Sequence, residues 1–148
     1  MRSKLTIAVA TATSAALLAA PAGADAKLWK GKTKQGRVVS VRTGADGLVT
    51  AVRIRWKSRC DDGRTLTGRT GFRPPFDRSE PRGFEDGGEY PDETTSGLTS
   101  TNTAFVRGTL TRGGPWRGRF HITSVLQRNG RTVATCRLRS TRWTARSR

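Results

Sequence analysis

Basic and apolar side chains alternate along the stretch Leu48–Cys60, which carries the clearest chemical pattern in the sequence. Val52, Ile54 and Trp56 occupy every second position, and arginine or lysine stands between and after them. Because successive side chains of a strand point to opposite faces, this alternation predicts one buried face and one basic face in water. A guanidinium group can hold a phosphate or a carboxylate through two parallel hydrogen bonds. The stretch therefore predicts a strand that could bind anions.

Similar alternation recurs in two later stretches, Trp116–Leu126 and Arg131–Trp143. If all three stretches share a sheet, their basic side chains could lie on one surface. The candidate polyanion-binding residues are Arg53, Arg55, Lys57, Arg59, Arg117, Arg119, Arg137 and Arg139. The net charge of +17 favours anionic partners through long-range attraction. An arginine-rich composition without a binding role, or a solvated face covered by the acidic segment, would explain the same pattern.

Most acidic residues lie in one segment between positions 77 and 93. They are Asp77, Glu80, Glu85, Asp86, Glu89, Asp92 and Glu93. Carboxylates are ligands that calcium prefers, but their spacing does not match an EF-hand loop, and we expect no metal. A pair such as Glu85 and Glu89 could act as the acid and base of a glycosidase, which we treat as a disfavoured alternative.

Other catalytic signatures are missing from the sequence. His121 is the one histidine, and its phase predicts an exposed position on the outer face of a strand. No G-x-S-x-G nucleophile motif occurs, and no glycine loop precedes a helix. We therefore predict a protein that is not an enzyme and that needs no cofactor. The tryptophans Trp29, Trp56, Trp116 and Trp143 could instead line a pocket for a small apolar or carbohydrate ligand.

The amino-terminal residues have the anatomy of a secretory signal peptide. A basic start is followed by an uncharged run over Leu5–Ala20 and by Ala24-Asp25-Ala26, which suits signal peptidase. We therefore predict a signal peptide at 1–26 and a secreted, extracytoplasmic domain at 27–148. No second apolar run follows, so we expect no transmembrane segment in the mature chain, which we expect to be a monomer.

Two cysteines, Cys60 and Cys136, complete the chemical inventory. An even pair in an exported domain predicts a disulfide, because exported compartments are oxidising. The bond would close more than half of the mature domain into one loop. Both thiols would then be consumed, which argues against thiol catalysis.

Turn signals separate the apolar alternation into about six predicted strands. They cover residues 36–41, 48–60, 64–72, 103–111, 116–126 and 131–143. The sequence thus predicts an all-β, antiparallel meander closed as a small barrel or folded as a sandwich. The apolar phase changes within the last strand, which predicts a bulge near Ser140-Thr141. Prolines, glycines and acids at about 73–102 predict one long loop.

Several short motifs resemble a group of small secreted proteins of high-GC bacteria. They are W-x-G-x-T-x-x-G-R at Trp29–Arg37, Cys60-Asp-Asp-Gly63, Trp116-Arg-Gly-Arg-Phe120, and Cys136 followed by Trp143-Thr-Ala145. The resemblance covers most of residues 29–145 and implies no known activity and no site residues.

The sequence thus favours a secreted, non-catalytic β domain that binds an anionic envelope or extracellular component, such as an anionic polymer or lipid surface, through its arginine-rich sheet face. A domain that binds a small apolar or sugar ligand among its tryptophans is the alternative. Specific nucleic-acid binding is not expected, because the exposed face shows few aromatic side chains on which bases could stack.

Overall fold

The computed structural model describes residues 26–78, 81–93 and 97–147, and these residues form strands and turns without a helix. The strands are β1 (Lys27–Thr33), β2 (Val38–Thr43), β3 (Val49–Cys60), β4 (Thr65–Phe72), β5 (Gly83–Glu93), β6 (Thr99–Leu110), β7 (Trp116–Arg128) and β8 (Arg131–Ser147). All of them pair antiparallel, which confirms the predicted all-β class. The described residues contain no apolar helix of the length that a bilayer crossing requires. Apart from Ala26, the predicted signal peptide lies outside the described residues.

Two strands of the eight were not predicted, so the expected count of six is wrong. The sequence did not predict β1, because lysines and a glycine interrupt its short apolar pattern. The expected loop at about 73–102 contains all of β5 and the start of β6. Proline, glycine and acidic residues are depleted in strands. The residues of β5 are mostly of these types, so the sequence did not predict a strand there. Pro91 is tolerated there because β5 is an edge strand, where a missing backbone donor costs little.

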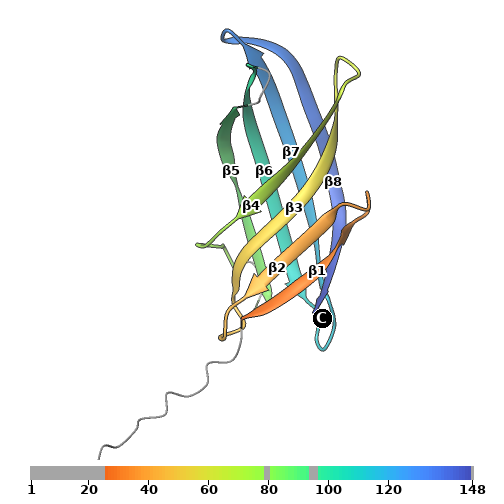
Figure 1. Cartoon of the computed structure of the whole chain (residues 1–148). Helices are drawn as coiled ribbons and strands as arrows, with labels where there is room; N and C mark the ends of the chain where they lie inside the picture. Colours follow the sequence, from red (N-terminus) through yellow and green to blue (C-terminus); the bar gives the residue numbers. More distant parts are fainter. Residues whose placement is uncertain (1–25, 79–80, 94–96, 148) are drawn as a thin grey trace, which may run out of the picture.

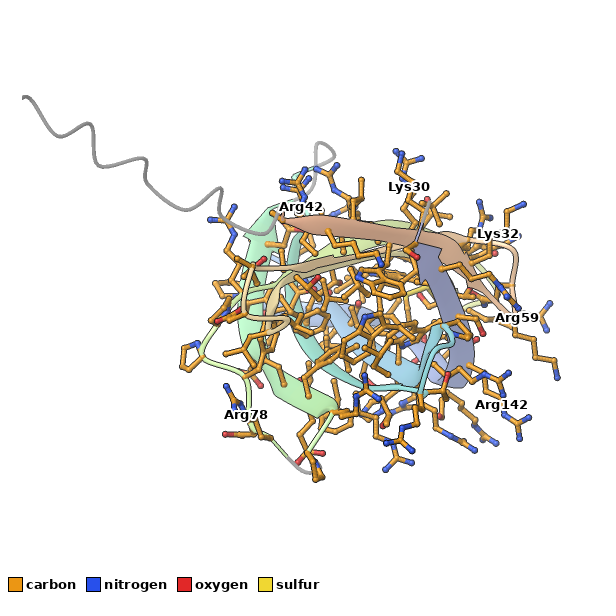
Figure 2. The ribbon with its side chains drawn as sticks, turned by 90° about the horizontal axis from the view of Figure 1, so that it is seen from below. Lys30, Lys32, Arg42, Arg59, Arg78 and Arg142 are labelled. Atoms are coloured by element: carbon orange, nitrogen blue, oxygen red, sulfur yellow. A yellow bond between two sulfur atoms is a disulfide. The ribbon has the colours of Figure 1, made fainter. Side chains whose placement is uncertain are left out.

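The eight strands form one curled sheet in the order β4-β3-β2-β1-β8-β7-β6-β5 (Figure 1). Consecutive strands pair throughout, except that β4 and β5 are the two edges of the sheet, and β1 pairs with β8. The sheet curves around an interior filled with side chains (Figure 2). At the edges, the hydroxyl groups of Thr70 on β4 and Tyr90 on β5 lie 2.9 Å apart. The described residues thus form a single open, curled sheet, neither a closed barrel nor two separate sheets.

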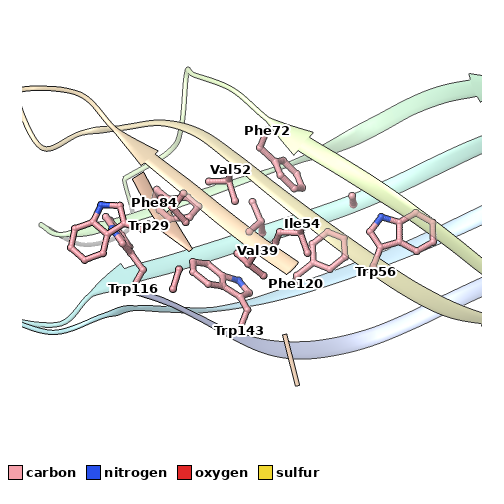
Figure 3. Close-up of a cluster of buried hydrophobic side chains, with 14 of the residues drawn as sticks. Trp29, Val39, Val52, Ile54, Trp56, Phe72, Phe84, Trp116, Phe120 and Trp143 are labelled. Atoms are coloured by element: carbon pink, nitrogen blue, oxygen red, sulfur yellow. The ribbon is translucent and has the colours of Figure 1, made fainter. Parts of the chain in front are cut away.

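Trp29, Phe84, Trp116 and Trp143 lie together toward one end of the interior, and further rings extend from them to Trp56 (Figure 3). Phe84 packs edge-on against Trp116 with ring centroids 5.4 Å apart, and Trp116 packs against Trp29 at 6.4 Å. Gly108 makes room for two of the rings, because an added Cβ would lie 2.6 Å from Phe84 and 2.7 Å from Trp143. In the same way, Gly68 makes room for the Trp56 ring and Gly118 for the Trp143 ring, so glycines on three strands mark places where large rings lie across the sheet.

The other end of the interior is polar and cross-linked. Asn102 donates a hydrogen bond to Ser100 over 3.0 Å and accepts one from Ser124 over 2.6 Å, and all three side chains are buried. Beside them, the predicted disulfide between Cys60 and Cys136 is confirmed. Small polar side chains bury little apolar area, so the covalent bond contributes to stability where packing contributes less.

The disulfide lies where β3 meets β8 directly. The short hairpin of β1 and β2 separates these strands along most of their length, and only Arg59 and Cys60 of β3 pair with β8, opposite Arg137 and Cys136. The hairpin turn is also tied to β3, because the Gln35 side chain donates to the Lys57 carbonyl over 2.8 Å. The bond therefore joins two parts of the sheet that share few backbone hydrogen bonds.

The bulge predicted in the last strand is confirmed. Phe120 pairs with Thr141, whereas Ile122 pairs with Leu138, so β8 contains one extra residue between those positions. Inward-facing residues change there from even to odd numbers, from Cys136 before the bulge to Trp143 after it. The irregularity brings Trp143 into the aromatic end of the interior.

Candidate anion-binding groove

The basic residues predicted as an anion-binding face are exposed on the outer face of the sheet, on three strands. Arg53, Arg55, Lys57 and Arg59 lie on β3, Arg117 and Arg119 on β7, and Arg137 and Arg139 on β8. The register brings Arg59 directly opposite Arg137. The curvature of the sheet spreads the set around the molecule, so that Arg59 points away on one side together with other basic residues (Figure 2).

Charge is sorted by strand in this sheet. Every charged residue in β1 to β4 and in β6 to β8 is basic, and every charged residue in β5 is acidic. Among the described residues, the one ion pair joins Arg64 to Asp62 at the turn between β3 and β4. Hydrogen bonds from the Arg64 backbone and side chain hold the Asp62 pKa below its ordinary value. The strand arginines therefore have no acidic partner within the described chain.

Four exposed arginines gather over β6, β7 and β8. Arg107, Arg119 and Arg142 lie directly opposite one another on three adjacent strands, and Arg117 lies one outward position away on β7. They line a hollow of about 480 Å³ together with Thr109, Thr144, Gly108, Gly118 and the buried rings of Phe84 and Trp143. We call this hollow and its four arginines the arginine groove.

No ion pair joins the arginine groove to an acidic residue of the described chain. Adjacent strands lie about 4.8 Å apart, and like charges placed directly opposite each other are destabilising. Glu85 of β5 is the register neighbour of Arg107, but no ion pair joins them. Arg119 donates a hydrogen bond to Ser140 over 3.4 Å, so the Arg119 side chain extends toward β8. An anion in the groove would relieve the repulsion among these side chains.

Sequence reasoning missed Arg107 and Arg142. Arg107 alternates with apolar residues in its strand, and this pattern indicates an outward position but not which arginines lie beside it. Arg142 follows the bulge, where the phase of β8 has changed, so its facing could not be read from the first half of the strand. Cross-strand register, which a linear sequence does not give, brings both of them to Arg119.

Further arginines, on β3, on β4 and just after β4, line a hollow near the other edge of the sheet. Arg53, Arg69 and Arg73 line a hollow of about 530 Å³. Arg55 and Arg69 lie directly opposite each other. Here the cross-strand pairing of like charges involves two strands, one of them the edge of the sheet, whereas the arginine groove spans three strands.

The tryptophans are mainly structural. The Trp56 indole donates to Thr70 over 2.9 Å, and the Trp29 indole donates to Thr43 over 3.4 Å. Trp116 differs, because it lines a hollow of about 650 Å³ with Phe84 and other apolar residues. Its buried indole nitrogen has no hydrogen-bond partner among the described residues, and neither has that of Trp143.

The acidic strand is poorly arranged for catalysis or metal binding. Glu85 and Glu89 are four residues apart on one face of β5, which places them about 13 Å apart along the strand. A glycosidase pair needs carboxyl groups about 5–9.5 Å apart. No three potential metal ligands of the described chain converge on a point. His121 is exposed on the outer face, stacked on Phe105 with ring centroids 5.3 Å apart.

Comparison with protein-family models, with curated proteins and with solved structures finds no match to this chain. The resemblance to secreted proteins of high-GC bacteria therefore stays a prediction. What the protein does has to be argued from the geometry and the charge of its own residues.

Proposed function

We propose that this protein is an exported, non-catalytic domain that binds an anionic polymer or surface of the cell envelope or its surroundings through the outer face of its sheet. The observation that carries the proposal is the uniform sign of charge on seven strands, whose basic side chains have no acidic partner in the described chain. A fold that needed charge only for solubility would be served by mixed signs, since both signs solvate the surface.

The expected binding is electrostatic. Each basic side chain that neutralises a phosphate or carboxylate releases condensed counterions, so the affinity falls as salt is added. Arginine adds geometric selectivity, because its planar fork matches the oxygens of phosphate and carboxylate. The disulfide supports the extracytoplasmic part of the proposal, because such bonds persist in oxidising compartments.

Retention on immobilised polymers tests this function. At about 0.15 M ionic strength, we expect the mature protein to be retained on polyphosphate and polyglutamate and to elute as salt increases. We expect no retention on neutral dextran. Passage through both anionic matrices without delay, or equal retention on dextran, would overturn the proposal.

A second candidate function rests on the hollow beside Trp116. Its apolar lining and the unpartnered indole nitrogen suit a small ligand that combines an apolar body with a hydrogen-bond acceptor. Salt-insensitive quenching of tryptophan fluorescence by such a ligand, lost in Trp116→Phe and kept in Trp56→Phe, would support it. No quenching by any member of a panel of fatty acids and sugars would count against it.

A further inference from the structure

We infer that the arginine groove is a discrete site for phosphoryl groups rather than one part of an evenly distributed basic surface. This inference rests on the proposed function and makes it more specific, because it names the chemistry of the ligand and the residues that hold it. The groove differs from the other basic positions in its cross-strand register. Three arginines of adjacent strands occupy one level of the sheet, and a fourth lies next to them.

The number of guanidinium groups favours phosphate over carboxylate. A carboxylate has two oxygens, and a single arginine fork can engage both of them. A phosphoryl group offers more acceptor oxygens, and a chain of phosphoryl groups can accept from several forks at once. Arg107, Arg119 and Arg142 stand side by side at the strand spacing, so an oligophosphate lying across β6, β7 and β8 would meet all of them.

The lining of the groove supports the same ligand. The hydroxyl-bearing residues Thr109 and Thr144 line the hollow beside Arg117. Gly108 and Gly118 bring backbone rather than side chains to the lining, because their missing side chains belong to the inner face, where rings cover them. The site is therefore rich in donors and has room of about 480 Å³.

The aromatic neighbours give no comparable support for a nucleobase. Phe84 and Trp143 line the hollow, but both are buried on the inner face and are only 2% exposed. Phe105 and His121 lie on the outer face one level from Arg107 and Arg119, but their rings stack on each other. Each ring thus already has one face covered by the other. The ligand class that the geometry favours is the phosphoryl chain itself, without a stacked base.

The chain offers a matched control for a direct test. Arg119 and Arg142 lie opposite each other on β7 and β8 within the groove, and Arg128 and Arg131 lie opposite each other on the same two strands near their hairpin turn. Arg128 and Arg131 are exposed and are not part of the groove lining. The variants R119Q/R142Q and R128Q/R131Q therefore remove the same charge from the same pair of strands.

The probes are inorganic tripolyphosphate and an oligoglutamate of matched net charge, titrated against each variant of the mature protein. We expect wild type to prefer tripolyphosphate. Loss of two charge-assisted contacts in R119Q/R142Q should weaken tripolyphosphate binding by about tenfold or more, whereas R128Q/R131Q should change it by less than about threefold, as expected for a remote surface charge. Unchanged thermal unfolding in both variants shows that the fold is intact.

The outcomes separate this inference from the broader proposal. Equal weakening in both variants would overturn the discrete groove and leave general polyanion binding in place. Equal affinity of wild type for the two probes would overturn the phosphoryl preference. Failure of wild type to bind tripolyphosphate while it is still retained on the polyphosphate matrix would overturn the groove and leave the broader proposal in place.

Phosphoryl groups reach an exported protein either in a soluble polymer or in lipid headgroups. Vesicles of phosphatidylglycerol in phosphatidylcholine and a soluble poly(glycerol phosphate) distinguish these sources. Selective weakening in R119Q/R142Q toward at least one of them supports the groove. Identical binding of R119Q/R142Q and R128Q/R131Q to both would contradict it.

Discussion

The inner and outer faces of this sheet differ in the physical interactions that account for their residue types. Inward side chains differ from one end of the interior to the other, from packed aromatic rings to a buried network of serine and asparagine beside a disulfide. Outward charges are uniform over seven strands, and they contact few other side chains in the described residues. Packing thus accounts for the inner face, whereas it does not account for the outer one. We therefore expect inner changes to affect stability and outer changes to affect binding.

The largest effect on the inner face should come from the disulfide. Cys60 and Cys136 are 76 residues apart, and the chain-entropy model assigns the closure of such a loop about 4.5 kcal/mol. The double variant C60S/C136S should therefore lose roughly that much unfolding free energy, measured by urea denaturation. Wild type under reducing conditions serves as the control. A midpoint equal to that of the oxidised protein would show that the polar end is held together without the bond.

A somewhat smaller effect is expected from the aromatic end. Phe120 is fully buried and packs edge-on against Phe72 with centroids 6.3 Å apart. Phe120→Ala removes a large ring from a packed site and should cost about 3–5 kcal/mol. Phe105→Ala, which removes a ring from the outer face of β6, is the matched control and should cost markedly less. Similar losses from both changes would remove the distinction between the faces.

Tyr90 tests the open edge between β4 and β5. Tyr90→Phe should cost about 1 kcal/mol, because the contact of its hydroxyl with Thr70 is lost. Burial raises the Tyr90 pKa above its ordinary value of 10.0. The unfolded state therefore ionises first, and this part of the stability is present below pH 10 and lost as pH rises through the folded pKa. Denaturation of wild type between pH 8 and pH 11 should show an alkaline loss that is smaller in Tyr90→Phe.

The smallest effect on stability should come from the outer face. R119Q/R142Q should shift unfolding free energy by no more than about 0.5 kcal/mol, the usual range for surface substitutions. Relief of like-charge repulsion favours a slight gain. Differential scanning calorimetry measures this change. A loss of several kcal/mol would mean that these arginines stabilise the fold, and their role as a binding surface would then lack its main argument.

Local patterns predicted the parts of this structure that are set by neighbours in sequence. Clean alternation predicted the strand at Leu48–Cys60, and the phase change in the last strand predicted its bulge. Composition gave the wrong prediction for β5, because an edge strand tolerates the acidic residues and the proline that central strands exclude. The pairing of β1 with β8 was not predictable, because the two strands are far apart in sequence and no local pattern specifies a strand's partner.

The same reasoning accounts for the partial prediction of the site. Arg117 and Arg119 were identified from alternation within one strand. Arg107 and Arg142 belong to the groove through register with the neighbouring strands, one of which contains a bulge. Alternation along one strand predicts which face of the sheet a side chain occupies, but not which residue lies opposite it on the next strand. The groove depends on the residues that lie opposite one another.

The salt dependence of tripolyphosphate binding tests the central claim most directly. Binding of phosphoryl groups by four arginines should give a clearly negative slope of log K against log salt, because added salt screens the attraction between the opposite charges. R119Q/R142Q should flatten this slope, whereas R128Q/R131Q should leave it nearly unchanged. A slope near zero in the wild-type protein would contradict binding through the basic outer face.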